Sequence, residues 1–250
     1  MRHFHKTQYV VVSILLLISI VFGLTTPVHA DPLTCADDLP TAVANANATA
    51  EDDIITLEVG CEFTLSAELP VTDTATGGSL KIVGNGSIIG GDSITRIFNV
   101  ANNGDLTLED VELRNGRVSG ANGGAIFTDG GTITLINSRL DDNAATQASG
   151  TTGGLGGAIY VINGTLNITD TAIDGNNAGG IDLTGTLGGG IYVEDSVLDL
   201  TGATVEFNQA GRGAGIYVAG TTSVVTIESS YFGDNDSDNG GAAIEGGAGV

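Results

Sequence analysis

Gly156-Gly157-Ala158-Ile159, with Asn176 seventeen positions after its Ile, is one copy of a unit that recurs through the second half of this 250-residue chain. Each copy begins with a Gly/Ala-rich tetrapeptide that ends in Ile. The five tetrapeptides are Gly123–Ile126, Gly156–Ile159, Gly188–Ile191, Gly213–Ile216 and Gly241–Ile244. Successive Ile residues lie 33, 32, 25 and 28 positions apart, whereas the following Asn comes seventeen positions after Ile three times and then nineteen. A constant segment followed by a segment of variable length indicates stacked repeats.

Apolar residues alternate with other residues inside each repeat, which predicts strands rather than helices. Ile159 and Val161 form one such pair, Leu166 and Ile168 a second, and Ile173 stands alone three positions before the Asn. Three short strands per repeat, each with one aliphatic face, cannot close a core by themselves. Stacked about 4.8 Å apart, they bury these faces in continuous columns. We therefore predict an all-β fold, a single-stranded parallel β-helix over residues 61–250.

The Asn residues form the second regular column, the Asn ladder. An Asn tolerates the left-handed backbone of a sharp corner, and its amide can bond to the Asn of the next repeat. The Gly pairs indicate another corner, where the backbone is crowded or φ is positive. The members of the Asn ladder are Asn143, Asn176, Asn208 and Asn235.

Residues 1–30 are predicted to be a signal peptide. Arg2 and Lys6 precede an apolar stretch over 9–24, and Val28-His29-Ala30 has the small-residue pattern of a cleavage site. An uncleaved membrane anchor is disfavoured, because the stretch is shorter than the about 20 residues of a spanning helix. We expect a secreted or cell-surface protein without a transmembrane helix in the mature chain.

Residues 31–60 are predicted to form an N-terminal cap, a helix plus a first strand. The helix is expected over 37–46, because an Asp pair precedes Pro40 and an Ala-rich stretch. Cys35 and Cys61 are the only cysteines, and an oxidising compartment favours a disulfide between them over two buried thiols. At the C-terminal end of the sequence, Gly249-Val250 follows the fifth tetrapeptide before the strands of that repeat are complete, so we expect the natural protein to continue.

The charge excludes several classes of function. All thirty acidic residues lie after residue 30 but only six of the eight basic ones do, so the mature net charge is −24. Such a chain repels phosphate backbones, so we expect no nucleic-acid partner. All three His residues belong to residues 1–30, which removes the commonest general base and zinc ligand.

The paired motifs resemble the polymorphic outer-membrane protein repeats, which combine GGAI-like and FxxN segments. The FxxN counterparts here are Leu140–Asn143, Ile173–Asn176, Val205–Asn208 and Phe232–Asn235. The resemblance covers roughly residues 97–245 and implies a right-handed β-helix of the pectin-lyase-like kind, displayed at the cell surface or outer membrane. Some proteins of this kind are adhesins.

Clustered carboxylates suggest catalysis, because glycosidases on β-helices use acid pairs. Asp141-Asp142 is the most tempting pair, but Asp174, Glu206 and Asp234 occur near the Asn of other repeats, so an acid there is general to the repeat. A lyase would need a base and calcium, and Arg114, Arg117 and Arg139 could approach one another on adjacent repeats. We assign no catalytic residue.

Two binding sets remain. Asp234, Asp236, Asp238 and Glu245 superficially follow a calcium-loop spacing, although Asn239 replaces the expected Gly and no helices flank it. An acidic corner loop is the preferred interpretation, so we expect no cofactor, with calcium as the possible exception. The residues between each inward-facing pair are expected to form an outward aromatic ladder that stacks on sugar rings, binds a protein, or merely packs along the sheet. Its members are Phe127, Tyr160, Tyr192 and Tyr217.

We therefore expect a non-catalytic, exported β-helix that binds a glycan or a surface protein, as an adhesin does. The alternative is a polysaccharide lyase or glycoside hydrolase on the same scaffold.

Overall fold

The alternating segments form short parallel strands, as their periodicity predicts. The computed structural model describes residues 31–72, 78–148, 154–180, 185–238 and 243–246. The expected signal peptide, Gly241-Ala242 of the fifth tetrapeptide and Gly249-Val250 lie outside the described residues. The described residues from Pro32 onward form one compact unit.

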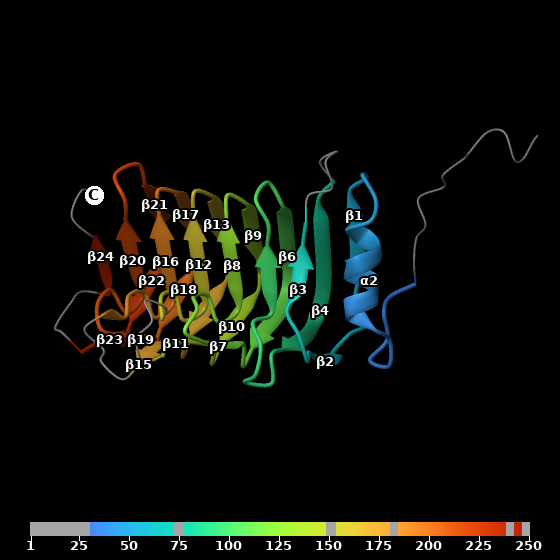
Figure 1. Ribbon diagram of the computed structural model, residues 1–250, viewed down its shortest axis with the longest axis horizontal. Coiled ribbons are helices and arrows are strands. Elements are labelled where there is room, and N and C mark those ends of the chain that lie inside the picture. The colour runs from blue at the N-terminus through green and yellow to red at the C-terminus, as the bar shows by residue number, and fades with distance from the viewer. Residues whose placement is uncertain (1–30, 73–77, 149–153, 181–184, 239–242, 247–250) are drawn as a thin grey trace, which may run out of the picture. The chain divides into compact units, whose positions relative to one another are not determined.

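The strands assemble into three parallel sheets (Figure 1). Each repeat contributes two successive strands to the largest sheet, called here its first and second strands. The long strands β4 and β6 each span both positions. Its first strands are β1 (Asp53–Thr56), β4 (Leu80–Gly90), β6 (Asp105–Arg114), β9 (Thr132–Ile136), β13 (Thr165–Thr169), β17 (Val197–Thr201) and β21 (Val224–Glu228). Its second strands are β2 (Glu62–Thr64), β10 (Arg139–Asp141), β14 (Ala172–Asp174), β18 (Thr204–Glu206) and β22 (Tyr231–Gly233).

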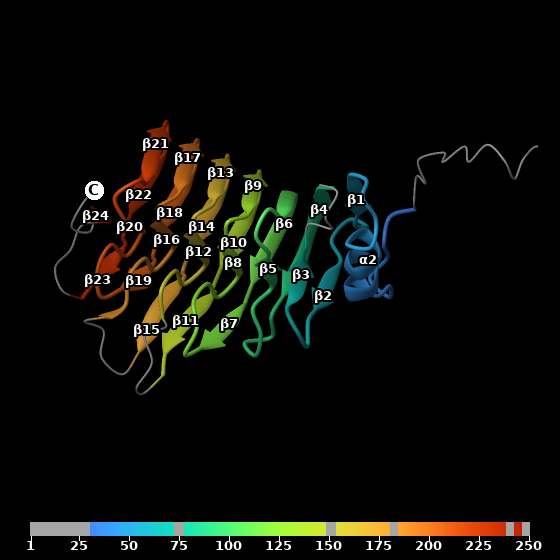
Figure 2. The same cartoon turned by 45° about the horizontal axis from the view of Figure 1, so that its top comes forward.

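The other two sheets take one strand each from a repeat, and Figure 2 shows all three sheets running side by side along the stack. The seven-stranded sheet consists of β3 (Leu69–Val71), β5 (Phe98–Val100), β8 (Ile126–Asp129), β12 (Ile159–Ile162), β16 (Ile191–Glu194), β20 (Ile216–Ala219) and β24 (Ile244–Gly246), and the last five of these strands begin at the Ile of a tetrapeptide. The five-stranded sheet consists of β7 (Arg117–Ser119), β11 (Ala144–Gln147), β15 (Asn177–Gly180), β19 (Gln209–Ala210) and β23 (Asp236–Ser237).

Every strand pairs with the equivalent strand one repeat away, and the register follows the sequence motif. Ile159 lies beside Ile126 and Ile191, and Leu166 lies beside Ile133 and Leu198. The alternating aliphatic side chains point into one continuous core and are almost fully buried. The predicted all-β, parallel arrangement is confirmed.

The five-stranded sheet was not predicted. Four of these strands follow a ladder Asn directly, in the segment expected to be a loop of variable length, whereas β7 follows Gly116. In β11, β15 and β19 the buried side chain is a single Ala: Ala145, Ala178 and Ala210. One Ala per strand is too weak an alternation to indicate a strand, although in these three strands it stands two residues after the Asn.

The tetrapeptide glycines have two different roles. Gly156 has a φ of 63°, in the left-handed region that glycine adopts without steric cost. A Cβ added to Gly157 would lie 2.1 Å from the carbonyl oxygen of Gly189 in the next repeat. The first Gly therefore turns the chain, and the second allows adjacent repeats to approach.

A column of hydroxyl groups closes the corner between the first and second strands of the largest sheet. Ser138 donates its hydroxyl to the carbonyl of Ile136 (2.8 Å) and accepts the backbone N–H of Val111 (3.3 Å). The backbone N–H of Ser138 in turn donates to the Thr171 hydroxyl (3.2 Å). These bonds satisfy buried backbone donors at a bend.

The N-terminal helix, α2 (Leu39–Ala46), packs on β1 and β3, the first strands of two sheets. Leu39 and Val43 are fully buried in the main core. Cys35 and Cys61 form the predicted disulfide, with 5.0 Å between their Cα atoms. The cap is also fixed at the other end of the helix.

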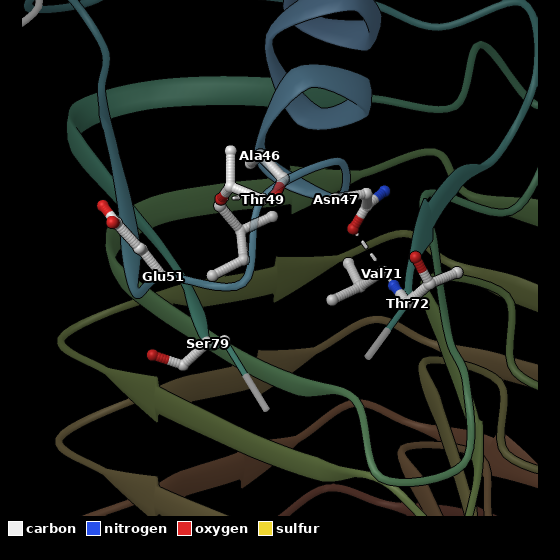
Figure 3. A pocket seen from close by; sticks show the side chains of 9 residues that line it. Ala46, Asn47, Thr49, Glu51, Val71, Thr72 and Ser79 are labelled. Carbon is white, nitrogen blue, oxygen red and sulfur yellow. Dashed lines mark hydrogen bonds between the residues drawn. The ribbon is translucent and has the colours of Figure 1, made fainter. Parts of the chain in front are cut away.

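At that end Asn47 donates to the carbonyl of Pro70 (2.6 Å) and accepts from the backbone N–H of Thr72 (3.1 Å). Figure 3 shows Asn47 reaching across to Thr72 beside a cavity of about 10 Å³. This space holds at most one water, so it is a packing gap rather than a ligand pocket.

Candidate binding surface

The aromatic ladder exists, with its four rings in register on successive strands. Tyr160 lies beside Phe127 and Tyr192, and Tyr192 lies beside Tyr217. The ring centroids are 5.4, 5.0 and 5.8 Å apart, and the planes deviate from parallel by at most 8°. The regular strand register therefore imposes a face-on stack.

The ladder is not an exposed surface, however. Tyr160, Tyr192 and Tyr217 are only 7, 5 and 5 % exposed, and together with Phe127 they pack against Leu155 and Leu187. These leucines come from the segments that lead into the tetrapeptides and pair with each other as an isolated bridge. The expectation of exposed rings is wrong, because period-2 alternation identifies the face away from the core but cannot reveal a second layer over it.

An arginine lies against the ring at each end of the aromatic ladder. The guanidinium carbon of Arg96 is 5.0 Å from the centre of Phe127, and that of Arg212 is 5.4 Å from the centre of Tyr217. Arg96 also pairs with Glu68 (2.5 Å). Burial lowers the pKa of Arg96, and Glu68 opposes this shift. These two arginine–ring contacts were not predicted from the sequence, because neither arginine belongs to the repeated motif.

The surroundings of Tyr160 and Tyr192 raise the pKa of both phenol groups. Burial raises the pKa of Tyr160 to about 12, with nearby Glu194 and Asp129 adding to the shift. Burial, with a hydrogen bond to Glu194 (3.0 Å), raises the pKa of Tyr192 as well. The three stacked tyrosine rings are almost fully buried and offer no face to a ligand.

The Asn ladder is continuous. The side-chain amide of Asn143 donates to Asn176 Oδ1 (3.0 Å), that of Asn176 to Asn208 Oδ1 (3.0 Å) and that of Asn208 to Asn235 Oδ1 (2.9 Å). Each also donates to a backbone carbonyl one repeat earlier, as Asn176 does to Leu140 (3.0 Å). The predicted amide-to-amide bonding is confirmed.

The left-handed corner residue is not the Asn but the residue before it. Asp142, Gly175, Phe207 and Asp234 have φ between 48° and 66°, whereas the Asn residues have ordinary backbone angles. The expectation that Asn itself adopts this conformation is wrong. The Asn instead points inward from the turn and bonds its neighbours, while the preceding position supplies the bend.

Of the candidate catalytic acids, Asp141 lies on the outer face of the largest sheet and Asp142 occupies the left-handed corner that follows it. Asp141 and Asp174 occupy the same register position, and Glu206 follows them one repeat later. Arg139 pairs with both Asp141 (3.1 Å) and Asp174 (2.8 Å). Partial burial and the neighbouring carboxylates of Asp141 and Asp174 raise the pKa of Asp142, against the effect of Arg139.

The three arginines considered for a lyase site do not all come together. Arg114 lies beside Asp141 in register and pairs with Glu62 (2.7 Å). Arg139 lies beside Glu112 on the same face. Arg117 belongs to β7 in the five-stranded sheet. The outer face of the largest sheet thus carries alternating, mutually paired charges.

A shallow groove of about 250 Å³ runs along the edge of this face, at the corner between first and second strands. The corner residues Asp110, Asn137 and Asp170 come from three consecutive repeats and all have positive φ. Glu112 and Arg139 supply the outer wall. The groove was not predicted from the sequence, although an Asn, Asp or Gly at each strand-to-strand turn is a recognisable signal. This groove is the candidate binding surface.

The proposed calcium ligands do not converge in the described part of the chain. Glu245 lies in β24 and bonds to Arg212, and no three of the carboxylates of Asp234, Asp236, Asp238 and Glu245 lie within 4.8 Å of one another. In the described ranges, the one such grouping of three Cys, His or acidic ligand atoms is Cys35, Glu58 and Cys61, whose sulfurs form the disulfide. The loop over 239–242 lies outside the described residues.

No family model, curated protein or solved structure matches this chain. Within the described residues, no helix has the length and apolar character needed to span a membrane.

Proposed function

We propose that this chain is an exported, right-handed parallel β-helix that acts as a non-catalytic binding and structural module at the cell surface or outside the cell, related to the polymorphic outer-membrane protein repeats. The parallel registers and the Asn ladder support the β-helix. The paired GGAI-like and FxxN segments support the relationship, and the apolar stretch in residues 1–30 supports export. N-terminal sequencing of the exported protein tests that last point, with Asp31 as the expected first residue.

One observation carries the non-catalytic assignment: Arg139 bridges Asp141 and Asp174 across two repeats. These acids belong to a register column that continues to Glu206, so their position follows from the repeat rather than from a reaction. A general acid–base pair needs two carboxyl groups with separate environments and access to substrate. Asp141 and Asp174 share the guanidinium of Arg139, so their environments are not separate.

The ligand surface in this proposal is the corner groove. Its carboxylates, amide and guanidinium offer both hydrogen-bond donors and acceptors, as polyhydroxylated glycans and polar protein loops require. Glu112 and Asp170 contribute acceptors to its lining. The aromatic ladder has no direct part in binding, because its rings are covered.

The enzyme alternative depends on Asp142. A carboxyl group with a raised pKa is suited to act as a general acid, and Arg139 lies close enough to influence it. A lyase or glycosidase would then release reducing or unsaturated products from pectic, alginate or neutral polysaccharides. We expect no release, and product formation that disappears in Asp142→Asn would establish the enzyme instead.

Binding is tested on a glycan array and on immobilised host-surface proteins. Glu112→Gln together with Asp170→Asn removes two groove charges with little change of shape, so affinity for any partner found should fall by at least about tenfold. The matched control is Asp199→Asn together with Glu228→Gln, two exposed acids on β17 and β21 of the same sheet but outside the groove. Equal losses in both variants would mean that net charge, not the groove, determines binding.

A further inference from the structure

Phe207 combines two features that folding alone does not favour. Its φ is 53°, in the left-handed region that a bulky side chain avoids, and every other non-glycine residue with positive φ in the described ranges is Asn, Asp or Ser. Its side chain is also 57 % exposed, so it adds little to the core. Backbone strain of this kind is concentrated at functional sites.

The exposure of Phe207 does not come from its place in the stack. The next repeat is paired with it, because the N–H of Phe207 donates to the carbonyl of Gly233 (3.3 Å) and Asp234 follows at the same corner. The ring therefore lies on the side of the stack, where further repeats would leave it exposed.

The space beside Phe207 is open because the preceding repeat has Gly175 at this corner. A Cβ added to Gly175 would lie 3.1 Å from Oδ1 of Asp142 and 3.5 Å from Oδ1 of Asp141, both one repeat earlier. Two carboxylate oxygens thus lie next to the place where a side chain is absent. We call this place, with Asp142 on one side and Phe207 on the other, the Gly175 notch.

The Gly175 notch has room for one flat ring. Asp142 and Phe207 are two repeats apart, which is about 9.6 Å at the usual strand spacing. A ring in contact with Phe207 lies about 4 Å from it. The remaining space fits a hydrogen bond of about 2.7 Å from a hydroxyl at the edge of that ring to a carboxylate. Arg139, which pairs with Asp141 (3.1 Å), adds a donor beside the acceptors.

We propose that the Gly175 notch binds one pyranose ring of a neutral, β-linked glycan with equatorial hydroxyls. Such a ring has an apolar C–H face, which would pack on Phe207, and a polar edge, which would donate to Asp141 and Asp142. The carboxylates repel an acidic sugar, so the glycan is neutral. This inference rests on the proposed function. It specifies the ligand class and adds a second contact surface, at the end of β10 opposite the corner groove.

The test uses cellohexaose, a neutral β-linked oligosaccharide, titrated calorimetrically into the full chain. Phe207→Asn removes the ring and supplies a residue that tolerates positive φ, so the melting temperature should not fall. The affinity should fall by at least about tenfold, since the aromatic contact is lost. The matched control is Val59→Asn, at an apolar side chain that is 78 % exposed in the turn before β2, and it should bind as the unchanged chain does.

A second variant tests the notch without changing the ring. Gly175→Asn places a side chain in the notch at a φ of 66°, which Asn tolerates, and should abolish cellohexaose binding. Retained affinity in this variant or in Phe207→Asn would overturn the inference.

The groove variant, Glu112→Gln with Asp170→Asn, distinguishes the two binding surfaces. It should still bind cellohexaose through the Gly175 notch. Cellohexaose binding that the groove variant loses and Phe207→Asn keeps would reject the notch and leave the proposed function standing. A chain that binds an immobilised surface protein through the groove but does not bind cellohexaose would also overturn this inference alone.

Discussion

Replacing Asn176 by Ala should destabilise the protein more than any surface change. Asn176 is fully buried, and its loss leaves the backbone N–H and the amide of Asn143 without their acceptor and the carbonyl of Leu140 without this donor. An unsatisfied buried group costs about 1–3 kcal/mol. Allowing for some relaxation, we expect a loss of about 3–6 kcal/mol from a free energy of unfolding of about 5–15 kcal/mol.

Urea denaturation followed by far-ultraviolet circular dichroism measures this loss. The matched control is Asn235→Ala, which removes the same side chain from the half-buried end of the Asn ladder, where water can replace the lost bonds. The control should cost less than about 1.5 kcal/mol. If Asn176→Ala lowers the free energy of unfolding no more than Asn235→Ala does, the buried hydrogen bonds of the Asn ladder do not stabilise the fold.

Three further changes examine other features. The pKa of Tyr160 is raised from 10.0 to about 12 in the folded protein, so the phenol of the unfolded chain ionises first and the free energy of unfolding should fall as pH rises between these values. Tyr160→Phe should flatten that decline, and an unchanged pH profile of stability in the variant would contradict this reasoning. Replacing Cys35 and Cys61 by Ser should lower the free energy of unfolding by roughly 3 kcal/mol and accelerate amide hydrogen exchange in the helix before the repeats. Equal acceleration of exchange throughout the chain would show that the disulfide does not stabilise the cap locally. Gly157→Ala, whose Cβ would lie 2.1 Å from the carbonyl oxygen of Gly189, should cost about 1–3 kcal/mol, and an unaltered melting temperature would show that the repeats have room to separate.

The sequence predicted the columns because the repeat carries the same information several times. Ile159, Leu166 and Ile173 each align with apolar residues in neighbouring repeats, and all are buried. The disulfide was predictable from compartment and cysteine count. The strand after each Asn was not, because a single buried Ala gives no clear periodicity.

The candidate site was less predictable, for a physical reason. Alternation along a strand shows which side chains leave the core, but not what covers them. Tyr160 and Tyr192 leave the main core and meet Leu155 and Leu187, which lie four positions before their Ile residues and outside the strand pattern. The groove involves turn residues such as Asn137, whose side chains from separate repeats meet only after stacking.

The interchangeability of neighbouring repeats has a consequence for how the chain tolerates change. If residues 159–190 were excised as one block, Ile191 would follow Ala158 directly, and β16 would lie on β8 in the register that β12 has now. Asn208 would then face Asn143, and Tyr192 would face Phe127. A deletion of 32 residues at this boundary should therefore disturb the fold less than the single substitution of Asn176, and gene duplication or loss in whole units is an accessible way to lengthen or shorten this protein.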